Sequence, residues 1–134
     1  MIHLIILAQG GMAAGLVDAI EHVLGKRPPA LDIQPIDYHE SQESLAKKLT
    51  ARLADLHGTA GVLILADVYG SSHTNAACGL LKPGQVELVS GVNVPMLLRV
   101  LSYRQLPMHE LIRKALSGGT EGIVHAGQKR GGGA

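Results

Sequence analysis

GVLILADVYGSSHTNAA, residues 61–77, joins a strand pattern to a helix pattern through a polar loop. The run from Gly61 to Ala66 is continuously apolar, which is typical of a strand buried on both faces of a parallel sheet. Small and polar side chains then follow from Asp67 to Asn75. Because ligands of open α/β sheets bind beyond the carboxyl ends of the strands, this loop is the first candidate for a functional site.

The same alternation of strand and helix extends over the rest of the chain. Further apolar runs predict strands over Ile2–Ala8, Leu31–Tyr38 and Val86–Ser90. Leucine and isoleucine at helical spacing predict helices between them, and Ser41 is predicted to cap the second of these. Two more helices are predicted after residues 95 and 107, both of which are proline. The order predicts an α/β fold, namely a doubly wound, open, mainly parallel sheet with helices on both faces.

The C-terminal part is predicted to add one short strand. Gly118 and Gly119 are expected to end the last helix, and Thr120–Ala126 is expected to form the strand. Residues 1–127 are predicted to be a single domain, because 134 residues suit one hydrophobic core. Residues 128–134, rich in glycine, are expected to be a flexible tail.

Composition narrows the functional classes. Twelve basic and eleven acidic residues give a net charge of +1, and aromatic residues are only 2% of the chain, so nucleic-acid binding is not expected. Cys78 is the single cysteine, which excludes an internal disulfide and fits a reducing compartment. The apolar start Met1–Leu7 is too short to span a bilayer, so we expect a cytoplasmic protein. No histidine pair has metal-ligand spacing, and neither a metal nor a cofactor is expected.

The loop after the first strand contains Gln9, Gly10 and Gly11. Glycines let the backbone approach a ligand closely, and the free N–H groups at a helix start attract an anion such as phosphate. A tight strand-to-helix turn without any ligand explains the glycine pair equally well.

Polar side chains are concentrated in the loop after the third strand. Asp67 can orient an imidazole or accept a proton, Ser71 and Ser72 can bind phosphate oxygens, and His73 can act as a nucleophile or base. The purely structural interpretation makes Ser72 the helix cap and Asp67 a turn residue. Asn93, after the fourth strand, is expected to reach the same edge of the sheet.

These loops resemble those of the mannose/fructose/sorbose-type enzyme IIA family of the bacterial sugar phosphotransferase system. The resemblance rests on Asp67–Ser72 with Asn75–Ala77, on Gly91–Leu97 and on Gly118–Gly122, and it covers nearly the whole chain. In that family a histidine in a His-Gly pair just after the first strand accepts a phosphoryl group from the phosphocarrier HPr and passes it to a IIB component.

The resemblance carries specific expectations for this chain. It places Gly10 at the acceptor position, where glycine cannot be phosphorylated, and it gives Asp67 the role of orienting the acceptor and Ser72 that of holding phosphate. It implies HPr and a IIB component as partners, with peripheral attachment to a membrane permease complex. It also implies a homodimer that exchanges the segment Thr120–Ala126. His73 is a second departure, since proline commonly stands there in the family.

Several functions remain open at this point. The first is a regulatory or binding protein that keeps the fold and the pocket but is not phosphorylated at Gly10, or a phosphocarrier that has been mutated there. The second is a phosphocarrier that uses His73 as its acceptor. A receiver-like domain phosphorylated on Asp67 is disfavoured, because Ala8 and Gln9 supply no acidic pair for Mg²⁺. A small anion-binding α/β module is the fourth.

Overall fold

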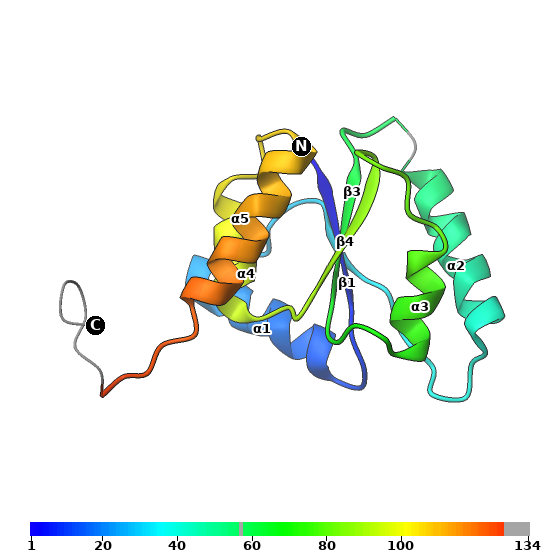
Figure 1. The fold of residues 1–134 in the computed structure, drawn as a ribbon, viewed down its shortest axis with the longest axis horizontal. Helices are drawn as coiled ribbons and strands as arrows, with labels where there is room; N and C mark the ends of the chain where they lie inside the picture. Colours follow the sequence, from blue (N-terminus) through cyan, green and yellow to red (C-terminus); the bar gives the residue numbers. More distant parts are fainter. Residues whose placement is uncertain (57, 128–134) are drawn as a thin grey trace.

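A computed structural model describes residues 1–56 and 58–127 as a three-layer α/β sandwich (Figure 1). Four parallel strands form the middle layer, with α1, α4 and α5 on one side and α2 and α3 on the other. The elements in chain order are β1 (His3–Leu7), α1 (Met12–Leu24), β2 (Leu31–Ile33), α2 (Gln42–Asp55), β3 (Val62–Ala66), α3 (Ser72–Cys78), β4 (Val86–Ser90), α4 (Val94–Ser102) and α5 (Met108–Glu121).

The strand order is β2-β1-β3-β4, and all neighbouring strands are parallel. The connections therefore run outward from β1 in both directions, and the loops after β1 and β3 leave the sheet side by side. This confirms the predicted doubly wound, open, parallel sheet. It also identifies the switch point between β1 and β3, where such folds build their ligand sites.

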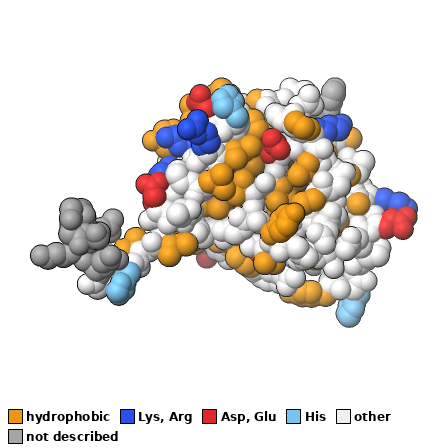
Figure 2. Space-filling view, in the orientation of Figure 1, with side chains coloured by type: hydrophobic (Ala, Val, Ile, Leu, Met, Phe, Trp, Pro, Cys, Tyr) orange, Lys and Arg blue, Asp and Glu red, His pale blue; other side chains and the backbone are white. Residues whose placement is uncertain are grey.

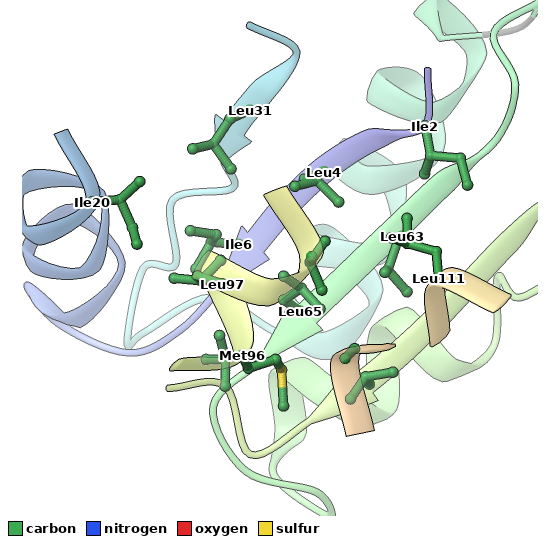
Figure 3. Packing of buried hydrophobic residues seen from close by; sticks show 14 of the residues in the cluster. Ile2, Leu4, Ile6, Ile20, Leu31, Leu63, Leu65, Met96, Leu97 and Leu111 are labelled. Carbon is green, nitrogen blue, oxygen red and sulfur yellow. The ribbon is translucent and has the colours of Figure 1, made fainter. Parts of the chain in front are cut away.

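Alternate residues of the central strands point to opposite layers, as strand geometry requires. Leu4 and Ile6 pack toward α1, α4 and α5, whereas Ile5 and Leu7 pack toward α2 and α3. All four are fully buried, and each contributes about 1.5–3 kcal/mol of hydrophobic stabilisation. Figure 3 shows the side of the sheet that packs against α1, α4 and α5, with Leu97 of α4 between the strands and α1.

β2 is shorter than the predicted strand Leu31–Tyr38. It ends at Ile33, because Pro35 has no N–H with which to continue the ladder. The residues that follow, up to the start of α2 at Gln42, form an irregular connection beside the end of β1. This shortening brings a third segment to the carboxyl edge of the sheet.

The prediction that Gly118 and Gly119 end the last helix is wrong. Both are buried inside α5, and a Cβ atom at Gly118 would lie 2.6 Å from the Cβ of Arg99 in α4. The glycine pair therefore allows close packing of two helices and does not mark a turn.

The predicted strand Thr120–Ala126 is also wrong for the single chain. α5 continues to Glu121, and residues 122–127 pair with no strand among the described residues. In Figure 1 this segment, coloured red, leaves the domain after α5. A strand needs a neighbour, and nothing in the described part of the chain supplies one there. The predicted flexible tail, 128–134, lies outside the described residues.

Candidate functional site

Three segments meet at the carboxyl ends of β1, β2 and β3, the end of the sheet away from the label N in Figure 1. They contribute Gln9, the connection 36–45 and the pair Ser72–His73, which together line a cavity of about 160 Å³. We call this cavity the rim hollow. It is large enough for about five water molecules at ~30 Å³ each, and so for a small polar group.

A short polar contact beside the rim hollow joins His73 to Asp67. The His73 Nε2 atom lies 2.6 Å from Asp67 Oδ1, and the two side chains are only 5% and 10% exposed. Asp67 follows β3 directly, and His73 lies in the first turn of α3, so the loop between them folds back on itself. Ser71 caps α3 by accepting a hydrogen bond from the Thr74 amide, which fixes that return.

The carboxylate of Asp67 is held in its charged form. Burial alone would raise the pKa of Asp67, but hydrogen bonds from His73 and from the amides of Gln9 and Val68 outweigh it and hold the pKa below its ordinary value. The amide of Gln9 is 3.0 Å from Oδ2 and that of Val68 is 2.7 Å from Oδ1. Asp67 thereby ties the loop after β1 to the loop after β3.

The same network assigns the proton of His73. An ionised Asp67 can only accept hydrogen bonds. Ser71 Oγ has one proton, which it donates to Thr74 Oγ1 at 2.9 Å, so it too accepts from the ring nitrogen 3.2 Å away. Both partners of His73 Nε2 are therefore acceptors, and Nε2 must carry the hydrogen. In the neutral ring this leaves Nδ1 as the nitrogen with a free lone pair.

A side chain at residue 10 would be strained and would have to displace the Tyr38 hydroxyl. The φ of Gly10 is +57°, a left-handed conformation that favours glycine, and a Cβ added there would lie 2.7 Å from the hydroxyl oxygen of Tyr38. The neighbouring residue, Gln9, lines the rim hollow together with Ser72 and His73, and its amide donates to Asp67 Oδ2. Residue 9 therefore reaches the site without the displacement of Tyr38 that a side chain at residue 10 would require.

Glu40 adds a second carboxylate to the wall of the rim hollow. Hydrogen bonds from Lys48 first, and from Ser44, lower the pKa of Glu40 below its ordinary value. Its Oε2 lies 2.6 Å from Lys48 Nζ, whereas its buried Oε1 has no hydrogen-bond partner among the described residues. The ion pair with Lys48 and the hydrogen bond from Ser44, both residues of α2, thus neutralise much of the charge of Glu40.

Not every predicted site residue reaches the rim hollow. Asn93 uses its Oδ1 to cap α4 at the Met96 amide and its Nδ2 to bind the Gly119 carbonyl, so it fastens α5 to the start of α4. The prediction that Ser72 caps the third helix is wrong, because α3 already includes Ser72 and the hydroxyl of Ser71 forms the cap. Gly11 is the N-cap residue of α1. Ser72 and His73 do line the rim hollow.

The residues that sequence reasoning missed are Gln9, Tyr38 and Glu40. The latter two come from the connection after β2, where Tyr38 was expected to end the strand and Glu40 lies just beyond it. A signal for it was present in Pro35, which disfavours a longer strand. For Gln9 the sequence offered only its place before a glycine pair.

Fold and site together define an open α/β domain with a carboxylate–imidazole pair at its topological switch point. The family model described as PTS system fructose IIA component matches residues 3–116. The chain belongs to this family of mannose/fructose-type enzyme IIA components.

Named relatives agree with this assignment. The chain is 35% identical over 127 residues to a PTS system mannose-specific EIIAB component of Escherichia coli, an alignment that covers 91% of this chain and 38% of that protein. The chain thus spans well under half the length of this relative. It is 31% identical over 121 residues to the PTS system fructose-specific EIIA component of Bacillus subtilis, covering 87% and 82% of the two chains.

Among solved structures, the phosphotransferase system component EIIA from Streptococcus agalactiae matches with a TM-score of 0.83 at 23% identity. The match covers 95% of this chain and 98% of that one. It supports the fold. Two negative findings concern residues 1–56 and 58–127: no helix there is long and apolar enough to cross a membrane, and no three His, Cys, Asp or Glu side chains are grouped as a metal site.

Proposed function

We propose that this chain is an enzyme IIA component of a sugar phosphotransferase system that binds HPr and a IIB component at the rim hollow but carries no phosphate at residue 10. Family membership supports the partners. The observation that carries the rest is Gly10 itself, which has no side chain and therefore no nucleophile. Such a protein acts in the cytoplasm, where these partners are found.

The surface around the rim hollow supports protein docking. Val68 and Tyr69, directly after Asp67, are 52% and 73% exposed. Exposed aromatic and aliphatic side chains beside a functional site are typical anchors of a protein partner. The loop that holds them is rigidly tied by Asp67 and by the Ser71 cap, so binding costs little ordering entropy.

Binding is tested by titrating the ¹⁵N-labelled chain with unphosphorylated HPr and, separately, with a IIB component. We expect chemical-shift changes at Gln9, Val68 and Ser72 and a weaker affinity for Tyr69→Ala. Tyr103→Ala is the matched control, because Tyr103 is 41% exposed at the far end of α4 and should leave binding unchanged. Equal loss of affinity in both variants, or no binding to either partner, would remove the proposal.

We also propose that the protein is a homodimer in which the segment after α5 pairs with a second copy. β4 is an edge strand, so beyond Val86, which bonds to Lys82, its outer backbone groups pair with no other strand among the described residues. Figure 2 shows hydrophobic side chains gathered between α5 and the sheet on the face where β4 runs. Ile123 and Val124, 79% and 49% exposed, supply an apolar segment that can cover such an edge.

The dimer is tested by light scattering on the intact chain and on a chain truncated after Glu121. We expect a dimer for the first and a monomer for the second. A monomeric intact chain, or a truncated chain that is still dimeric, would contradict strand exchange. Attachment to a permease complex would follow from binding to the IIB component and is read in the same titration.

A further inference from the structure

We propose that His73 is a phosphorylation site of this chain, with Nδ1 as the acceptor atom. The inference rests on the proposed function, because a phosphohistidine protein is the donor that a phosphotransferase partner would bring to the rim hollow. It assigns to His73 the role of nucleophile, for which the loop after β1 has no histidine. Three features of the site carry it: the tautomer of the ring, the space in front of it and the groups around that space.

The tautomer makes Nδ1 the reactive atom. Asp67 at 2.6 Å and Ser71 at 3.2 Å both accept from Nε2, so the lone pair lies on Nδ1. A carboxylate behind the opposite nitrogen orients an imidazole nucleophile and stabilises the positive charge that develops on the ring as it reacts. No hydrogen bond among the described residues uses His73 Nδ1, so that nitrogen is not occupied by the fold.

Space and donors are present next to the ring. His73 lines the rim hollow, whose 160 Å³ accommodate a phosphoryl group. Tyr38, Ser72 and Gln9 line the same cavity, and they carry hydroxyl and amide groups that can donate to phosphoryl oxygens. Glu40, the carboxylate in the wall, is already bonded to Lys48 and Ser44, which weakens its repulsion of the phosphoryl group.

The transfer step balances without any further reactant. The Nδ1 lone pair attacks phosphorus, a new N–P bond forms, and the donor's N–P bond breaks with its electron pair returning to the donor nitrogen. No proton leaves His73, because Nδ1 carries none. The Nε2 hydrogen stays on the ring and remains hydrogen-bonded to Asp67. The product ring is positively charged and remains 2.6 Å from the Asp67 carboxylate, which stabilises it.

The test uses the intact chain and potassium phosphoramidate, a small donor that needs no docking surface. Labelling is followed by intact mass, ³¹P NMR and peptide mapping. We expect one phosphoryl group per chain on Nδ1 of His73, formed at roughly ten times the rate at any exposed histidine, which corresponds to about 1.4 kcal/mol in barrier. The label should be lost in His73→Gln and retained in His39→Gln, whose histidine is exposed.

Asp67→Asn tests whether the orientation of the His73 imidazole by Asp67 matters, and not only the presence of that imidazole. It should slow labelling of His73 and leave labelling of His39 unchanged. The proposal is overturned if the folded wild-type chain takes no label at His73, if the phosphate lies on Nε2, or if exposed histidines react as fast. Mapping the wild-type chain decides this even if a variant fails to fold. Failure here with HPr binding intact would leave the proposed function standing.

Discussion

Two buried polar clusters stand at opposite ends of the sheet, and they are built differently. At the amino ends of β1 and β2, the guanidinium of Arg104 donates to the backbone carbonyls of Ile2, Pro29 and Ala30. At the carboxyl ends, His73 and Asp67 bond side chain to side chain beside a hollow. In the first case a buried side chain holds backbone segments together, and in the second a buried ring lines a cavity and keeps one nitrogen without a hydrogen bond among the described residues.

Arg104 is therefore expected to matter for stability. Arg104→Met removes three hydrogen bonds from a charged donor, of which the one to the Ile2 carbonyl is buried, while the Ala30 carbonyl keeps the Leu4 amide as a donor. A hydrogen bond to a charged group contributes about 1.5–3 kcal/mol. We expect the free energy of unfolding to fall by about 3 kcal/mol or more in urea titrations. Arg113→Met is the control, since Arg113 is exposed on α5 and should change stability by less than about 0.5 kcal/mol. Equal losses of stability in the two variants would mean that the Arg104 hydrogen bonds to the backbone do not stabilise the fold.

Asp67 is expected to have a smaller effect on stability and a distinct pH dependence. Asp67→Asn weakens the bond to His73, and we expect a loss of about 1–2 kcal/mol at pH 7. Because the pKa of Asp67 in the folded chain lies below its ordinary value, the stability it provides is present above about pH 4 and is lost as the pH falls through the folded pKa.

Urea titrations at a series of pH values measure this difference. The gap in unfolding free energy between wild type and Asp67→Asn should close as the pH falls below about 4. A gap that stays constant down to strongly acidic pH would show that the Asp67 carboxylate is not held in its charged form.

The smallest effect is expected at the glycine pair after β1. Gly10→Ala should lose about 1 kcal/mol, because a side chain at φ +57° is strained and contacts Tyr38, whose exposed ring can turn aside. Gly11→Ala should be neutral or slightly stabilising, since its φ is −84° and a Cβ there meets nothing within 4 Å. Thermal unfolding of both variants compares them, and equal melting temperatures would refute the assigned backbone.

The fold was predictable because its signals are local. Continuous apolar runs mark β1, β3 and β4, Ser41 caps α2 as predicted, and proline opens α4 and α5. The errors come from tertiary packing. Gly118 and Gly119 look like a helix end in sequence, but they are the contact surface of α5 on α4.

The candidate site was predictable in part. Asp67, Ser72 and His73 were found because a polar loop after a buried strand stands out in any parallel-sheet sequence. The bond between Asp67 and His73 was not, since it depends on how the loop turns back. Nor was Arg104, whose three carbonyl partners lie 74 to 102 residues away in the chain. The choice between residues 9 and 10 also needed backbone angles, because each precedes a glycine.

Phosphorylation of two engineered chains tests the central geometry of the site most directly. Both carry His73→Gln, which removes the native imidazole and frees Asp67, and they add Gln9→His or Gly10→His. With phosphoenolpyruvate, enzyme I and HPr, we expect the Gln9→His chain to form phosphohistidine faster than the Gly10→His chain, whose side chain must first displace Tyr38. Equal or faster labelling of the Gly10→His chain would contradict the assignment of residue 9 as the position that reaches Asp67 most easily.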